Sequence, residues 1–248
     1  MGDVDSLPVR ILLHQVEGPI NLGSILRVMA NFNFTSLRFT GPLTGEEEEV
    51  RKFALHATDI MTQAVKCADF TTLIEHCHIV VGLTPRSPWD DARQLRYTEF
   101  PDYVAKWLND GLDIGLLFGN EAHGLSNREL SRCDYRLSLP TSEVYPSMNL
   151  SHAVAATLLP LHQVRLKGNA QKTNLIRSAQ KELLTRKMLA FMSTMNFLPQ
   201  EDSDTRQEME ALWSGRGLTQ REWELLMGLF NKATSRYRAL LKKSQDTK

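Results

Sequence analysis

Three short segments of the sequence combine glycine, amide and charged side chains in patterns that suit a ligand site. They are Asn21–Arg27, Phe118–Leu125 and Pro140–Leu150. In the second segment Gly119 and Gly124 flank an acidic residue, which is typical of a tight loop whose backbone approaches a ligand. This segment has neither the GxGxxG spacing of a dinucleotide-binding turn nor the lysine of a Walker loop, so neither of those phosphate sites is predicted.

Each segment also has a purely structural explanation. Asn21 is a suitable N-cap for a helix that begins at Leu22, and Ser147 or Asn149 could cap a helix that begins a few residues later. Arg27, taken alone, is typical of an ordinary surface arginine. No single segment therefore predicts a function.

The elements that must position these segments alternate between strands and helices. Residues 9–165 combine short apolar runs with helical periodicity, which predicts an α/β layer fold. The expected strands are Arg10–Val16, Ser36–Thr40, His78–Leu83, Ile114–Phe118 and Tyr135–Leu139. The expected helices are Leu22–Phe32 and Leu150–Val164, and Tyr103–Leu108 is expected to be part of another helix. Glu46–Glu49 is expected to be a solvated loop or a first helical turn. All three segments follow expected strands, at the sheet edge where open α/β sheets bind ligands.

The last third of the chain has a different character. Beyond Arg165 the sequence gives no strand signal, whereas Thr205 with Glu208 and Thr219 with Glu222 form two potential capping boxes. A single helical face follows the second box: Trp223, Leu226, Met227, Phe230 and Tyr237. We therefore expect an α/β domain at residues 1–166 and a small all-helical extension at residues 167–248.

Several classes of protein are excluded by composition. The 248 residues are 42% apolar and 23% charged, as in ordinary globular proteins. The longest apolar runs, such as Ile114–Phe118, fall far short of the roughly 20 residues that a membrane span needs, and no signal peptide begins the sequence, so a cytoplasmic protein is expected.

Metal binding is not expected either. Cys67, Cys77 and Cys133 are odd in number and have no CxxC spacing, which indicates reduced thiols. His76 and His78 flank Cys77, but alternate strand positions point to opposite faces and no second ligand pair is near in the sequence.

In their order and spacing, the three segments resemble the motifs of the SpoU-type RNA ribose methyltransferases, members of the SPOUT class. The matching patterns are N-x-G-x-x-x-R, then F-G-x-E-x-x-G-L, then a proline followed by S-[LM]-N-L-S, with Met148 in place of the usual leucine. The resemblance covers about residues 8–166. The helical extension and residues 80–86 are most similar to the TrmJ branch, which modifies tRNA.

The resemblance implies a Rossmann-like, mostly parallel sheet with a C-terminal deep trefoil knot. It also implies a pocket for S-adenosylmethionine, in which apolar side chains flank the adenine ring and glycines allow close approach. Carried over by position, the cofactor residues are Leu83, Thr84, Pro85, Gly119, Glu121, Gly124, Leu139, Ser147, Met148 and Asn149.

The implied reaction transfers the sulfonium methyl group to a ribose 2′-hydroxyl. The implied catalytic residues are Arg27, Asn21, Glu121, Ser147 and Asn149. An arginine with a pKa above about 12 is a poor base at neutral pH, so we expect Arg27 to hold the target phosphate and ribose. Asn21 would position the same region and Glu121 would organise its loop, while Tyr145 either contacts the target nucleotide or packs within its own loop.

The implied partners are tRNA and a second copy of the chain, because family members act as homodimers in which the arginine approaches the partner's pocket. In the TrmJ branch the target is the cytidine or uridine at tRNA position 32, in the anticodon loop. Three alternatives remain open: a ribosomal RNA methyltransferase, a homologue that binds RNA without catalysis, and an unrelated nucleotide-binding α/β enzyme.

The charge distribution adds a second indication of RNA. The 29 basic and 29 acidic residues give zero net charge, which by itself argues against a nucleic-acid-binding protein. Residues 1–164 however carry a net charge of −7 and residues 165–248 a net charge of +7. The basic residues of the last expected helix are Lys232, Arg236, Arg238, Lys242 and Lys243. They form either a solvated face or, as the upstream motifs favour, a phosphate-binding surface.

Overall fold

The computed structural model describes residues 7–42, 47–85, 93–164, 174–197, 203–213 and 217–245. Its centre is a seven-stranded sheet in the order β3-β2-β1-β6-β4-β7-β5, in which every pair of neighbours is parallel. The strands are β1 (Val9–Leu13), β2 (Leu37–Phe39), β3 (Val65–Lys66), β4 (Ile79–Leu83), β5 (Gln94–Leu95), β6 (Ile114–Phe118) and β7 (Tyr135–Leu137). The predicted α/β class and the mostly parallel sheet are confirmed.

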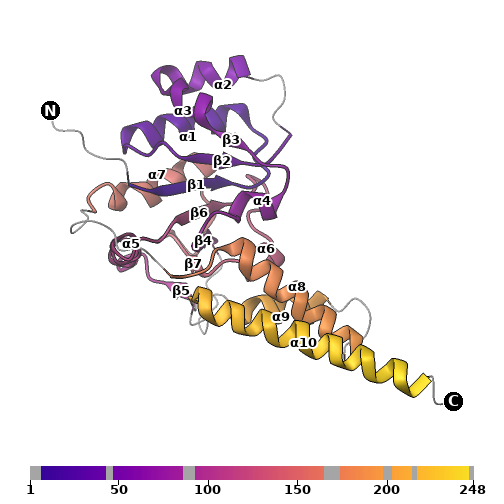
Figure 1. The fold of residues 1–248 in the computed structure, drawn as a ribbon. Helices are drawn as coiled ribbons and strands as arrows, with labels where there is room; N and C mark the ends of the chain where they lie inside the picture. Colours follow the sequence, from indigo (N-terminus) through magenta and orange to yellow (C-terminus); the bar gives the residue numbers. More distant parts are fainter. Residues whose placement is uncertain are drawn as a thin grey trace.

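Helices cover both faces of this sheet (Figure 1). One face packs against α1 (Pro19–Asn31), α2 (Glu47–Ala54), α3 (Thr58–Gln63), α5 (Phe100–Asn109) and α7 (Leu150–Leu161). The other face packs against α4 (Phe70–Ile74) and α6 (Asn127–Ser131). Side chains alternate along β1, so that Ile11 and Leu13 join the first core and Leu12 joins the second. A central strand buried on both sides explains why β1 and β6 are almost entirely apolar.

Two element boundaries differ from the prediction. β1 ends at Leu13 rather than Val16, because Gln15 adopts a left-handed backbone conformation with φ of 55° that turns the chain out of the sheet. Helix α1 begins at Pro19, whose fixed φ favours the first helical position, with Gly18 as its N-cap. The prediction that Asn21 caps this helix is therefore wrong, since Asn21 lies inside the first turn.

Two helices also differ from the prediction by three residues at one end, since α5 begins at Phe100 and α7 ends at Leu161. Glu47–Glu49 form the first turn of α2, whereas Glu46 lies outside the described residues. The two-residue edge strands β3 and β5 were not predicted. Strand β6 has the predicted bounds.

After the sheet, the described chain is helical: α8 (Ser178–Thr194), α9 (Ser203–Trp213) and α10 (Gln220–Gln245). Helices α8 and α10 run side by side in the same direction, and α10 continues past the end of α8 (Figure 1). The side-chain amides of Gln180 and Gln220 meet at 2.9 Å near the two helix starts, and the rings of Phe191 and Phe230 lie 5.9 Å apart further along. The predicted division at residue 166 falls outside the described residues.

The expected caps and apolar face of this region are mostly present. The Thr219–Glu222 capping box is confirmed, since Thr219 N donates to Glu222 Oε2 at 2.9 Å and Glu222 N to Thr219 Oγ1 at 3.2 Å. The Thr205–Glu208 box is wrong, because α9 already includes Ser203. Along α10 the residues that pack against the Ile176–Leu184–Leu218 cluster are Trp223, Leu226, Met227 and Phe230. Tyr237 is outside that cluster.

Helix α8 attaches to the N-terminal edge of the sheet through buried charge. Lys181 Nζ forms an ion pair with Asp134, just before β7, and donates to the backbone carbonyl of His78 at 3.2 Å. The second oxygen of Asp134 accepts from Val80 N at 2.9 Å. Since Lys181 and Asp134 are 9% and 2% exposed, this contact fixes the helices to the sheet away from solvent.

No helix in the described ranges is long and apolar enough to cross a membrane. The three cysteines are free and buried. Burial raises the pKa of Cys77 and of Cys133 to about 12, so both are neutral thiols at physiological pH.

Candidate functional site

A pocket of about 240 Å³ lies at the C-terminal edge of the sheet, where β4, β6 and β7 end. The chain segments that follow these three strands form its walls, as expected for an open parallel sheet. The predicted cofactor residues that line it are Leu83, Thr84, Pro85, Gly119, Glu121, Gly124, Leu139, Ser147 and Met148. The structure therefore brings together all but one of them, and the remaining one, Asn149, caps the adjacent helix α7.

The two glycines of the loop after β6 are required for different reasons. A Cβ on Gly119 would lie 2.2 Å from the carbonyl carbon of Gly124, so no side chain fits there. Gly124 has open space around it but a φ of +67°, which L-residues rarely adopt. Together they let the loop fold back on itself and leave its backbone facing the pocket.

Polar side chains join the three sequence segments. Glu121 accepts hydrogen bonds from Gly18 N at 3.0 Å and from the side-chain amide of Asn21 at 3.3 Å. Asn149 Nδ2 donates to Asn21 Oδ1 at 3.1 Å, while Asn149 Oδ1 accepts from Ser151 N at 2.9 Å and so caps α7. The Glu121 carboxylate therefore links the pocket loop to the start of α1 and does not stand free of partners.

Several residues of the pocket were not predicted from the sequence. Phe118, Leu137 and Leu150 are apolar wall residues at element ends; Phe118 and Leu150 lie in the quoted motifs but were not among the predicted cofactor residues. Asn120 and His123 also line the pocket, and both occupy motif positions at which any residue is accepted. For Asn120, the sequence indicated only that the residue follows a glycine at the end of a predicted strand.

The predicted RNA-contacting residues lie elsewhere. Arg27 is an exposed residue on α1 and does not line the pocket of its own chain. Tyr145 is 76% exposed, so the alternative that it packs within its loop is wrong. On α10, Lys232, Arg236 and Arg238 are exposed. Lys242 and Lys243 belong to the same helix, but their side chains lie outside the described part of the chain.

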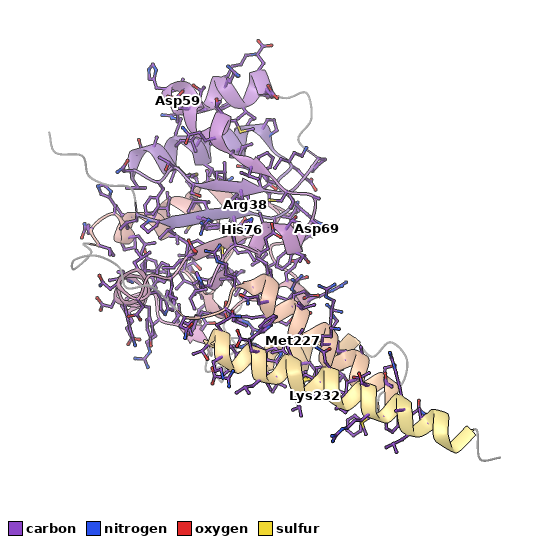
Figure 2. All side chains as sticks on the ribbon, viewed as in Figure 1. Arg38, Asp59, Asp69, His76, Met227 and Lys232 are labelled. Atoms are coloured by element: carbon purple, nitrogen blue, oxygen red, sulfur yellow. The ribbon has the colours of Figure 1, made fainter. Side chains whose placement is uncertain are left out.

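Helix α10 packs part of its apolar surface against α8, and its basic residues share the uncovered surface with the exposed leucines Leu225, Leu229, Leu240 and Leu241. Met227 packs on the side that faces α8, and Lys232 projects from the outer side (Figure 2). From residue 231 to residue 245 the helix carries basic residues and no acidic ones. Its distal half is therefore a positively charged surface that α8 does not cover.

The pocket is lined mainly by apolar side chains and loop backbone, with Glu121 and His123 as its ionisable groups. Apolar Leu83, Leu137 and Met148 suit a flat, largely apolar group, and the loop backbone can hydrogen-bond its polar edge. No group of three or more histidine, cysteine or acidic residues that could hold a metal occurs in the described part of the chain.

Residues 8–159 match the SpoU rRNA Methylase family. A methyltransferase of Methanocaldococcus jannaschii, named tRNA (cytidine-2′-O-)-methyltransferase TrmJ, is 35% identical over 187 residues, which is 74% of this chain and 81% of the relative. A protein of Pectobacterium atrosepticum, named tRNA (cytidine/uridine-2′-O-)-methyltransferase TrmJ, is 29% identical over 59% of this chain and 60% of its own length.

The fold is similar to a solved structure as well. The crystal structure of TrmJ from Z. mobilis ZM4 superposes with a TM-score of 0.79 at 16% identity, covering 90% of this chain and 97% of that one.

Proposed function

The chain belongs to the SpoU rRNA Methylase family, and on that premise we propose that it is a methyltransferase that uses S-adenosylmethionine to methylate a ribose 2′-hydroxyl in tRNA. One observation carries this proposal. Two of the three sequence segments line one pocket, and the third is joined to them through hydrogen bonds of Asn21 with Glu121 and Asn149. The names of the archaeal and bacterial relatives support tRNA, and cytidine or uridine, as the substrate class.

The residues present fit S-adenosylmethionine. The loop after β6 lines the pocket with Gly119 and Gly124, which carry no side chain to block a ligand, and Leu83, Leu139 and Met148 offer apolar contact to an adenine ring. When bound, the cofactor supplies an activated methyl group. The chain's own task is to align the attacking oxygen and to provide an exit for its proton.

Arg27 and Asn21 are the residues that we propose for the target nucleotide. The Arg27 guanidinium stays charged at neutral pH and can hold a phosphate and ribose, so we assign it binding and orientation. Since Arg27 is exposed and absent from the lining of its own pocket, it supports a homodimer in which each Arg27 approaches the partner's pocket. Exposed Tyr145, in the loop that precedes α7, is positioned to contact an RNA base.

The same proposal includes the finer features that family membership implies. These are a deep trefoil knot in the catalytic domain at residues 1–166, a tRNA-binding extension at residues 167–248, and position 32 of the anticodon loop as the target. Sedimentation of the purified protein at two concentrations tests the dimer.

We propose that the uncovered face of α10 binds phosphates. Reversing charge at Lys232, Arg236 and Arg238 should weaken tRNA binding and reduce its salt dependence, because each phosphate contact contributes about 0.9 to the slope of log affinity against log salt. Cofactor affinity should remain unchanged, since this helix does not line the pocket. An unaltered salt slope would contradict the role of the helix.

Mass spectrometry of nucleosides from cells that lack the protein tests the function. Loss of a 2′-O-methylated pyrimidine from tRNA is the expected result, and loss from ribosomal RNA would instead favour the other substrate. With purified protein, Arg27→Ala should reduce methyl transfer about 100-fold or more while cofactor affinity stays within about twofold of wild type. Undiminished turnover in this variant would refute the role given to Arg27.

A further inference from the structure

Asn120 lies between two segments that form different parts of the site. It is 9% exposed, and its side chain uses all of its hydrogen-bonding capacity. Nδ2 donates to Gln15 O at 2.9 Å and to Glu17 Oε1 at 3.1 Å, both in the segment between β1 and α1. Oδ1 accepts from Ala122 N at 2.8 Å and from His123 N at 3.3 Å, both in the pocket loop.

The segment on the donor side of Asn120 is strained. Gln15 has a φ of 55°, a left-handed conformation that costs about 1 kcal/mol or more for a residue with a side chain. Two hydrogen bonds hold it: Gln15 N donates to Thr40 Oγ1 at 2.8 Å, and Gln15 O accepts from Asn120. This turn directs the backbone N–H groups of Glu17 and Gly18 towards the Glu121 carboxylate.

We propose that Asn120 is a positioning residue that sets the pocket loop relative to the start of α1, and so keeps the cofactor pocket aligned with Asn21 and Arg27. The inference rests on the proposed methyltransferase function. Asparagine suits the position because one end of its amide donates and the other accepts. An aspartate would keep the contacts with Ala122 and His123 but would direct a carboxylate oxygen at the Gln15 carbonyl and the Glu17 carboxylate.

A separate contact keeps the two segments together when Asn120 is changed. His14 Nε2 lies 3.0 Å from Glu129 Oε1, and the Thr40 hydroxyl lies 2.9 Å from His14 Nδ1. His14 and Thr40 are buried, and the group joins the end of β1 to α6, which follows the pocket loop. Loss of Asn120 should therefore displace the loop without unfolding the protein.

The experiment compares Asn120→Asp with the double variant Asn120→Asp/Glu17→Gln in the full-length protein. Calorimetric titration with S-adenosylmethionine should show affinity about tenfold weaker for Asn120→Asp. In the double variant the amide introduced at position 17 can donate to the carboxylate introduced at position 120, so affinity should return to within about threefold of wild type. At saturating cofactor and tRNA, kcat of Asn120→Asp should also fall, since α1 carries Asn21 and Arg27. Asn31→Asp, the same chemical change at the exposed far end of α1, is the matched control.

The outcomes separate the inference from the function. Absence of cofactor binding in the wild-type protein would refute the proposed function. If the wild-type protein binds the cofactor, an equal affinity in Asn120→Asp would overturn the positioning role. A double variant that binds no more tightly than Asn120→Asp would also overturn it. A fall of more than about ten degrees in the unfolding midpoint of Asn120→Asp would also overturn it, because Asn120 would then act through global stability.

Discussion

The two edges of the same parallel sheet are built in opposite ways. At the C-terminal edge, glycine loops and amide side chains enclose an open pocket, and the hydrogen bonds that join them involve mostly backbone N–H groups. At the N-terminal edge, α8 covers the strand starts and buried ion pairs close the contact. The strand ends around the pocket are thus held by hydrogen bonds between carboxylates, amides and backbone N–H groups, whereas the strand starts are fixed by a buried Lys–Asp ion pair.

If the two edges differ in this way, removing a contact at the N-terminal edge should lower the free energy of unfolding and leave cofactor affinity unchanged. Asp134→Ala leaves Lys181 buried without its carboxylate and removes the acceptor for Val80 N. Loss of one partner of a buried pair costs about 3–5 kcal/mol, measurable by urea unfolding. Arg96→Ala, in the exposed pair of Arg96 and Glu99, is the control and should cost below about 1 kcal/mol. A change in cofactor affinity as large as the change in stability would show that the two edges are not independent.

The converse experiment is Gly119→Ala, which disrupts the C-terminal edge. The added Cβ would lie 2.2 Å from the carbonyl carbon of Gly124, so the loop must open. We expect cofactor affinity to fall about 100-fold, equivalent to about 2.7 kcal/mol, in a calorimetric titration. Gly228→Ala on α10 is the matched control, because the same substitution there meets nothing within 4 Å and lies outside the pocket lining. Equal losses in both variants would refute the steric explanation.

A third variant separates two roles of one side chain at the pocket edge. Asn149→Ala removes both the cap of α7 and the hydrogen bond to Asn21, and should lower the free energy of unfolding by about 1 kcal/mol. Asn149→Asp keeps the cap, because its carboxylate can accept from Ser151 N, but loses the donor to Asn21. Its stability should therefore stay near wild type while methyl transfer decreases. Wild-type turnover in Asn149→Asp would mean that the Asn21 contact is dispensable.

The smallest effect is a pH dependence at the N-terminal edge. Burial lowers the pKa of His78, and the positive charges of Arg177, Lys181 and Arg10 act in the same direction, whereas Asp113 opposes them. The unfolded chain therefore takes up the proton first, and stability declines as the pH falls from about 6.5 towards the lower pKa of the folded protein. His78→Asn should show a smaller decline between about pH 7 and pH 5.5 in urea unfolding. An identical slope would exclude His78 as the titrating group.

Local patterns predicted the centre of the sheet and most of the pocket. Strand β6 was predicted to the residue because it is apolar throughout, and nine of the predicted cofactor positions line one cavity. The two-residue strands β3 and β5 give no periodic signal, because a pattern of period two needs more residues than they contain.

The errors at Asn21 and Asn120, unlike the missed edge strands, do not come from elements that are too short to show a pattern. The proline at position 19 moved the helix start upstream, so Asn21 was free to bind Glu121 instead of capping. The role of Asn120 depends on residues about a hundred positions earlier, a contact that local reasoning does not detect.

The order of the strands also has a consequence for biosynthesis. Strand β1 pairs with β6 along its whole length, from Val9 opposite Ile114 to Leu13 opposite Phe118. Its second neighbour, β2, is made early, but the other side of β1 stays unpaired until the ribosome has added about a hundred more residues. During that interval an apolar strand edge is exposed on the nascent chain, which is the form most prone to aggregation and to capture by chaperones.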